Sequence, residues 1–296
     1  MNASLRGYLM ILLSATGFGS YGLWSRFIGP EFGIFTQGWV RSAIVLAILV
    51  PIAVYSKSFK KVAYNDRKWI FVTVLFGIAT QAPLYYAYNH MDIGTATLIF
   101  YAMFVITSYL VGRIFLGEKI THIKIAALIL AFLGLFLIFS FSIAIFSVLA
   151  MLLAAINGIA SGGEVATSKK STQKFSSLQI GIYVWVGILL THLPLALLVG
   201  EKQVPLTMNF VWFSMLGFAL AGLISFWLVI EGYKYVDASI GGLIGLLEIV
   251  FGVMFGIIFF HEHLTVTIIF GGFLIALSGM LPDLFAIRAK YIKRVS

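Results

Sequence analysis

The chain has 296 residues, of which 61% are hydrophobic and only 10% are charged, and its mean hydropathy is +1.03. A soluble globular domain carries about 25% charged residues, so the composition indicates a polytopic membrane protein and excludes an ordinary soluble one. The sequence contains no cysteine, which excludes disulfides, thiolate metal sites and thiol nucleophiles.

Ten apolar stretches follow one another along the chain, each long enough to cross a bilayer as a helix. They cover roughly residues 8–27, 34–55, 69–89, 93–116, 122–140, 143–167, 177–199, 209–233, 239–260 and 265–287. The longest connection, near residues 56–68, is too short to hold a soluble domain. The sequence therefore predicts an all-α membrane protein with ten transmembrane helices.

The formal net charge of +9 is explained by topology. An even number of spans places both termini on one side, and most of the 20 Lys and Arg residues then fall on that side. The exceptions are Arg26 and Lys202 on the opposite side and Arg41 inside the second span. By the positive-inside rule we expect both termini in the cytoplasm, in the plasma (cell inner) membrane, and no nucleic-acid partner.

The second half of the chain repeats the first. Residues 88–96 (YNHMDIGTA) align with 233–241 (YKYVDASIG), and residues 116–121 (LGEKIT) align with 260–265 (FHEHLT). The predicted repeats, 1–140 and 141–296, hold five spans each, an odd number, so the two copies cross the membrane in opposite directions. Inverted repeats are typical of transporters that work by alternating access, with the site between the copies near the midplane.

The ninth span and its end, LIGLLEIVFGVMFGIIFFHEHLT (residues 243–265), resemble the fourth helix of the second EamA repeat in the drug/metabolite transporter superfamily. The family pattern there is roughly L-E-P-V-x-A, a glycine-rich run and G-E-x-L-T. Here Ile249 replaces the proline and His261 the glycine. The resemblance covers nearly the whole chain and implies a secondary transporter with two inverted five-helix EamA repeats. It also implies that helices one, three, four, six, eight and nine surround the cavity.

Glu248 is the carboxylate in the middle of the ninth span. An acidic side chain at mid-depth costs about 2.5–3.5 kcal/mol on insertion scales, so it should not face lipid. On a helix it shares a face with four glycines, which let a neighbouring backbone approach closely: Gly241, Gly245, Gly252 and Gly256. The repeat places Met103 or Phe104 at the mirrored position. We predict that Glu248 binds substrate and carries a proton, the alternative being a buried structural carboxylate.

The sixth span carries a polar stripe at helical spacing, formed by Asn157, Ser161, Glu164 and Ser168. Such a stripe faces the bundle interior or water. We predict that Asn157, Ser161 and Glu164 bind substrate, with Glu164 as a second proton carrier. The span is similar to that of bacterial choline importers, which have a glutamate after a pair of small residues. Alternatively, Glu164 is an interfacial charge near Lys169.

Polar and aromatic side chains also share faces of the first, third and fourth spans. The predicted site residues among them are Tyr21, Gln81, Tyr85 and Tyr101. Tyrosine rings can hold a cation over their faces, although tyrosines at helix ends are often interfacial anchors. Arg41 either pairs with a carboxylate, gates the site or reaches toward the interface. Glu231 is expected to form an ion pair with Lys234. His261 and His263 could suggest a metal site, but no third ligand lies nearby in the sequence, so no metal site is expected.

These patterns favour a proton-coupled secondary transporter of an amine, a quaternary ammonium compound or an amino acid. The chain lacks a GxxxxGK[ST] motif, so we expect no direct use of ATP, no cofactor and no catalytic residues. The alternatives are a nucleotide-sugar carrier of the same superfamily, which would need clustered cations, and a non-transporting membrane subunit or an intramembrane enzyme. We expect a monomer or a homodimer in the bilayer, with a small molecule and a proton as partners.

Overall fold

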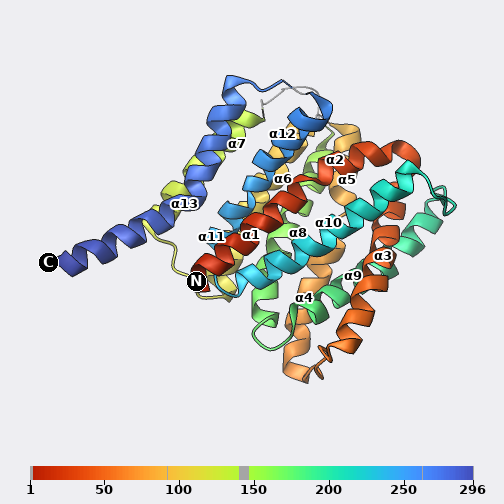
Figure 1. Ribbon diagram of the computed structural model, residues 1–296, viewed down its shortest axis with the longest axis horizontal. Coiled ribbons are helices and arrows are strands. Elements are labelled where there is room, and N and C mark those ends of the chain that lie inside the picture. Colours follow the sequence, from red (N-terminus) through yellow and green to blue (C-terminus); the bar gives the residue numbers. More distant parts are fainter. Residues whose placement is uncertain (1–2, 92, 140–146, 262, 296) are drawn as a thin grey trace.

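The computed structural model describes residues 3–91, 93–139, 147–261 and 263–295, and all regular structure in these ranges is helical (Figure 1). The helices are α1 (Ala3–Gly19), α2 (Tyr21–Ile28), η1 (Gly29–Glu31), α3 (Ile34–Tyr55), η2 (Tyr64–Asp66), α4 (Arg67–Ile78), α5 (Ala82–His90), α6 (Ile93–Phe115), α7 (His122–Ile138), α8 (Val148–Ser171), α9 (Ser177–Leu198), α10 (Phe210–Tyr233), α11 (Ala238–Gly245), α12 (Leu247–Phe260) and α13 (Val266–Val295).

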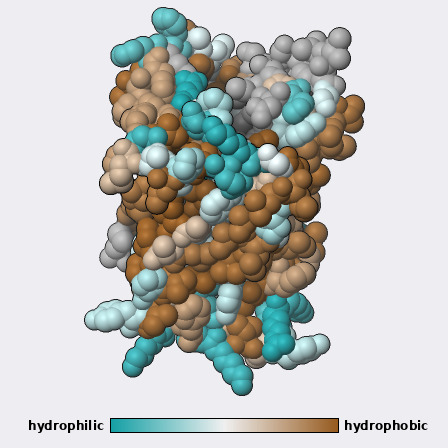
Figure 2. Space-filling view, turned by 90° about the vertical axis from the view of Figure 1, so that its right-hand side faces the viewer, coloured by the Kyte–Doolittle hydropathy of each residue, from teal (hydrophilic) through white to brown (hydrophobic). Residues whose placement is uncertain are grey.

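The apolar helices make this a multi-pass membrane protein. Six segments are long and apolar enough to span a bilayer: α3, α6, α8, α9, α10 and the α11–α12 pair. Two shorter apolar segments lie in α7 and in the first part of α13. The surface in Figure 2 carries a broad hydrophobic band with hydrophilic side chains above and below it, as expected for a protein surrounded by lipid.

Three of the predicted spans are interrupted, which their apolar composition did not predict. The first is broken at Ser20, whose hydroxyl donates to the carbonyl of Gly17 at 2.6 Å. The third is broken at residues 79–81, because Pro83 has no amide hydrogen to donate to the carbonyl four residues earlier, that of Ala79. The ninth is broken at Leu246, after three glycines that weaken helix formation.

Each helix packs against the same partners as its counterpart in the other half of the chain. α1 packs against α10, and correspondingly α8 packs against α4 and α5. α1 also packs against α11 and α12, as α8 does against α6. The pairs α3 with α9 and α7 with α13 each join one helix from each half, and α7 and α13 lie together at the edge of the bundle (Figure 1). The chain thus forms one bundle in which each half packs mainly on the other.

The contact between α6 and α8 depends on small residues. A Cβ atom on Gly158 would collide with the carbonyl of Phe100 and lie 2.8 Å from the Cβ of Met103. One turn further on, a Cβ on Gly162 would meet the carbonyl of Phe104 in the same way. The two backbones therefore approach closely, as they do at glycine-containing contacts in membrane proteins. This contact fixes the polar face of α8 relative to α6.

Candidate functional site

A cavity of about 540 Å³ lies inside the bundle, within the usual size range of small-molecule sites. It is lined by α1, α2, α6, α8, α10, α11 and α12, by the break between α4 and α5, and by Leu84 of α5. These belong to the six spans that the EamA resemblance implies. The structure adds Phe139, directly after α7, and α9, which contributes Val184, Trp185 and Ile188. Both halves of the chain therefore build the cavity.

Seven of the eight predicted site residues line this cavity: Tyr21, Gln81, Tyr101, Asn157, Ser161, Glu164 and Glu248. The side chain of the eighth, Tyr85, lies outside the described part of the chain. The helix faces that carry Tyr21 and Tyr101 are only partly in the wall, since Gly17 on the first span and Ser108 on the fourth do not line the cavity. Gly17 instead faces Ser225, and Ser108 packs against Gly242.

Glu248 begins the second half of the broken ninth span, in the first turn of α12. The positive end of the helix dipole favours a carboxylate at that position. Tyr101 of α6 hydrogen-bonds to the Glu248 carboxylate from the other half of the chain. The backbone around Glu248 is also close to α1, since a Cβ on Gly19 would lie 2.6 Å from the Glu248 carbonyl. The carboxylate is thus held where α1, α6 and α12 meet.

Glu164 is buried, with 7% of its surface exposed, so it is not a side chain that reaches the membrane surface. Gly77 of α4 leaves room for it, because a Cβ there would lie 2.6 Å from Oε1 of Glu164. Among the described residues, no side chain or backbone group forms a hydrogen bond or an ion pair with this carboxylate. Its neighbour on the same face, Asn157, donates to the carbonyl of Ala79 at 3.4 Å, in the α4–α5 break. A buried carboxylate without a partner is available to a ligand or a proton.

Arg41 of α3 lies behind the cavity wall, with 1% of its surface exposed. Its guanidinium donates to Oε1 of Gln81 and lies over the ring of Phe218, 4.1 Å from the centroid, and over Tyr21 at 5.5 Å. The sequence left open whether Arg41 pairs, gates or reaches outward. In the structure it points into the bundle, toward three residues that line the cavity.

Two further polar atoms in the wall were not predicted from the sequence. The indole nitrogen of Trp185 and the hydroxyl of Tyr233 are buried, and neither has a hydrogen-bond partner in the described part of the molecule. Both residues line the cavity. Buried tryptophan and tyrosine usually satisfy these groups, so two unpaired polar atoms beside one cavity are an exception. In the sequence they look like ordinary apolar helix residues.

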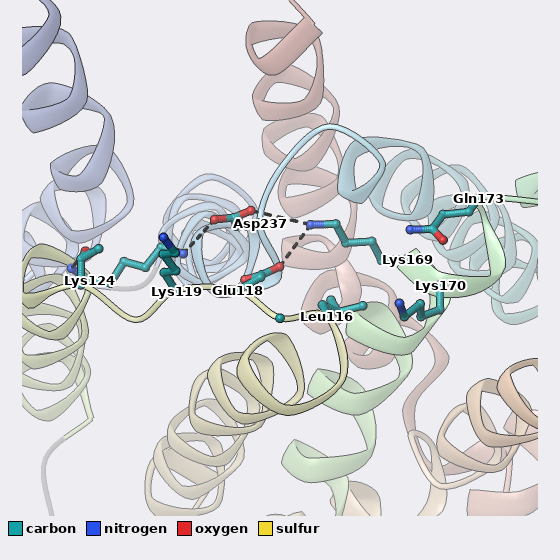
Figure 3. Close-up of a pocket in the computed structure, with 10 residues that line it drawn as sticks. Leu116, Glu118, Lys119, Lys124, Lys169, Lys170, Gln173 and Asp237 are labelled. Atoms are coloured by element: carbon teal, nitrogen blue, oxygen red, sulfur yellow. Dashed lines mark hydrogen bonds and ion pairs between the residues drawn. The ribbon is translucent and has the colours of Figure 1, made fainter.

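An ion-pair cluster joins the two halves at the end of the bundle that carries the basic loops (Figure 3). Lys169 of α8 contacts Glu118 at 3.1 Å, and Lys124 of α7 contacts Asp237 at 2.8 Å. Glu118 also accepts hydrogen bonds from the amides of Ala238 and Ser239 at 2.6 and 3.3 Å, and so caps α11. Asp237 is the residue before α11, but its side chain makes no capping hydrogen bond. The structure shows that Glu118 caps a helix of the other half.

The expected pair between Glu231 and Lys234 is confirmed, with a separation of 2.7 Å. It lies at the end of α10, and neither residue is part of the cavity wall.

Comparisons with known proteins agree with this architecture. No curated protein matches the sequence. A solved structure titled "Crystal structure of protein" has 15% sequence identity with the chain and a TM-score of 0.79, over 97% of this chain and 98% of that one. At this identity the likeness concerns the fold alone. The model of the EamA-like transporter family matches residues 5–140 and 148–281, one match in each half. The chain therefore belongs to the EamA-like transporter family.

Proposed function

We propose that the protein is a secondary active transporter that moves a small organic solute by alternating access and is coupled to protons. The observation that carries the proposal is the cavity between two halves with exchangeable packing, with Glu164 and Glu248 in its wall. A transporter must present one site to either side of the membrane, and repeated halves that pack on each other supply that symmetry. We assign no catalytic residues to the chain.

The transmembrane arrangement belongs to the proposal. The three broken pairs, α1–α2, α4–α5 and α11–α12, each count as one span, which gives ten spans in two inverted repeats, 1–140 and 141–296. In this proposal the protein lies in the plasma (cell inner) membrane, with both termini in the cytoplasm. The exchange symmetry of the helix contacts supports the two-repeat arrangement, and the Lys and Arg residues of the loops support the side given to the termini.

The cavity chemistry favours an amine, a quaternary ammonium compound or an amino acid as substrate. Two carboxylates and several aromatic rings, including Tyr21, Tyr101 and Trp185, suit a positively charged group. A nucleotide sugar would need several cations for its phosphates, and in the described part of the wall Arg26 is the basic side chain that lines the cavity directly. We propose that substrate is bound by the seven predicted residues that line the cavity: Tyr21, Gln81, Tyr101, Asn157, Ser161, Glu164 and Glu248. Tyr85 is also proposed, from the sequence alone.

Proton coupling rests on the two carboxylates. A carboxyl group that is shielded from bulk water in one state and accessible in another can take up a proton on one side and release it on the other. Glu248 is placed for this role because it lies where helices of both halves meet and accepts a hydrogen bond from Tyr101. Glu164 is the second candidate.

Alternating access requires the contacts at one end of the bundle to break while those at the other end form. The cluster of Glu118, Lys124, Lys169 and Asp237 ties the halves together at the basic end, which favours a closed state there. We propose that the cluster opens when the site faces the cytoplasm.

The test is solute flux into proteoliposomes driven by a pH gradient, with Glu248→Gln, Glu164→Gln and the exposed Glu31→Gln as a matched control. We expect Glu248→Gln to lose gradient-driven uptake while keeping solute exchange, because a fixed neutral side chain cannot carry a proton. Glu164→Gln should weaken binding and retain some driven uptake, and Glu31→Gln should behave as wild type. If both cavity variants transport normally, neither carboxylate couples transport. If no solute enters wild-type vesicles, the transporter proposal itself fails.

A further inference from the structure

Arg41 is an unusual buried charge. It lies in the apolar α3 helix, is almost fully buried, and has no carboxylate within 4 Å in the described part of the chain. Its Nε and Nη1 atoms have no hydrogen-bond partner there. A guanidinium carries five N–H donors, and a buried charge without an anion is costly. Charged side chains inside membrane segments normally face a partner or a pathway.

The contacts of Arg41 compensate its charge only in part. Its Nη2 atom donates to the side-chain oxygen of Gln81, and its guanidinium stacks over Phe218 and Tyr21. Such cation–π contacts stabilise a buried cation by roughly 2 kcal/mol, which is less than the several kcal/mol that removing an ion from water costs. Because Gln81, Phe218 and Tyr21 all line the cavity, the uncompensated positive charge lies directly behind its wall.

Gln81 itself marks a second positive feature, the N-terminus of α5. Gln81 is the residue that precedes this nine-residue helix, and its side chain makes no capping hydrogen bond to the first amides. Its amide oxygen is held by Arg41, while its nitrogen donates to Thr80 at 3.0 Å, which leaves one N–H of the amide for another acceptor. Thr80, Gln81 and Leu84 line the cavity at this point. An uncapped helix N-terminus with a cation beside it attracts an anion.

We propose that the corner formed by Arg41, Gln81 and the first turn of α5 binds the carboxylate of the transported solute. The inference rests on the proposed function and deepens it, since it selects a zwitterion, a solute with both a carboxylate and an ammonium group, among the proposed substrates. The carboxylate accepts from Gln81 and from the Ala82 and Leu84 amides of the first turn of α5, since Pro83 between them has no N–H to donate. Arg41 neutralises the carboxylate from behind and orients Gln81. The ammonium group lies toward Glu164 and Glu248, which line the same cavity.

The test uses pairs of solutes that differ only in the carboxylate: glycine betaine with choline, lysine with cadaverine, and tryptophan with tryptamine. Binding to purified protein and uptake into proteoliposomes are measured for wild type, Arg41→Gln, Arg41→Lys and the surface control Lys202→Gln. For the pair that the wild type transports, we expect it to bind the carboxylate member at least about 10-fold more tightly, because a site built for a hydrogen-bonding group rejects the analogue that lacks it.

The variants separate carboxylate binding from a structural role. Arg41→Gln should lose the preference for the carboxylate member and leave the affinity for its partner within about twofold. Arg41→Lys should recover part of the preference, and Lys202→Gln should match wild type. If Arg41 variants do not fold, Gln81→Leu, which keeps Arg41, gives the same readout.

Three results would overturn the inference. The first is a wild type that binds the member without a carboxylate as well as the carboxylate member or better, which leaves the transporter proposal intact. The second is an equal loss for both members in Arg41→Gln and Gln81→Leu, which would show a purely structural role. The third is an absence of transport for every solute, which removes the proposed function together with the carboxylate site.

Discussion

Replacing Glu118 by glutamine should open the basic end of the bundle. Glu118 has 8% of its surface exposed, and its carboxylate accepts four hydrogen bonds: from Lys169, from the amides of Ala238 and Ser239, and from the Ser239 hydroxyl. Lys169 and Ala238 bond to Oε1, and both Ser239 groups bond to Oε2. If Oε1 becomes the NH₂ of glutamine, it faces two donors, Lys169 and the Ala238 amide. If Oε2 does, it faces the Ser239 amide, and the Ser239 hydroxyl must turn to accept. In either case the negative charge beside Lys169 disappears.

The size of the effect follows from these contacts. Breaking one side of a buried charge pair costs about 3–5 kcal/mol. Lys169 keeps the Val236 carbonyl at 2.7 Å and lies 3.9 Å from Asp237, so the lower end of that range, about 3 kcal/mol, is expected. At about 1.4 kcal/mol per factor of ten, the open state of this end should become about 100 times more populated.

Amide hydrogen exchange measures the opening of this end locally, because the amides of Ala238 and Ser239 are themselves donors to Glu118. Their protection should fall by about 100-fold in purified Glu118→Gln protein. The control is Asp66→Asn, which removes the pair between Asp66 and the exposed Lys174 at 2.7 Å, where a loss below about 1 kcal/mol is expected. Unchanged exchange at Ala238 and Ser239, or an equal change in the control, would refute the assigned role of Glu118.

Two further predictions concern topology and packing. A cysteine at Lys57 should be shielded from an impermeant reagent outside intact cells, and one at Lys202 should react, since the basic loops are proposed to be cytoplasmic; the reverse pattern would invert the model. Gly158→Leu should lower the thermal midpoint by several degrees in a melting assay, because the side chain collides with α6. Gly181→Ala, whose Cβ would meet Leu49 at an ordinary 3.7 Å, should be tolerated, and equal loss in both would contradict the close α6–α8 contact.

The sequence predicted the parts of the site that depend on composition and period. Glu248 and Glu164 stand out because a carboxylate in an apolar span is costly to insert into a membrane unless it faces the protein interior. The stripe with Asn157 and Ser161 follows from helical spacing. The role of Arg41 could not be read in the same way. Its surroundings come from Gln81 on another span and Phe218 in the other half, and only tertiary packing brings these residues together.

The helix breaks were missed for a related reason. Hydropathy measures whether a segment can lie in lipid, and it is insensitive to a single turn in which the backbone leaves the helix. Pro83 and the glycines before Leu246 were visible in the sequence, but such residues also occur within continuous membrane helices. Trp185 and Tyr233 were missed because an apolar or aromatic residue carries no sign of an unpaired polar atom.

The two halves are alike in packing but not in charge. Both cavity carboxylates, Glu164 and Glu248, come from the second half, whereas Arg41 comes from the first. α9, the counterpart of α3, carries no Lys, Arg, Asp or Glu, and the repeat puts Met103 or Phe104 opposite Glu248. During alternating access each half adopts the conformation that the other half had before. The backbone arrangement is then inverted across the membrane, but each charged residue stays on its own half. A solute with two opposite charges would therefore keep one orientation throughout the transport cycle, held by the same residues on both sides of the membrane.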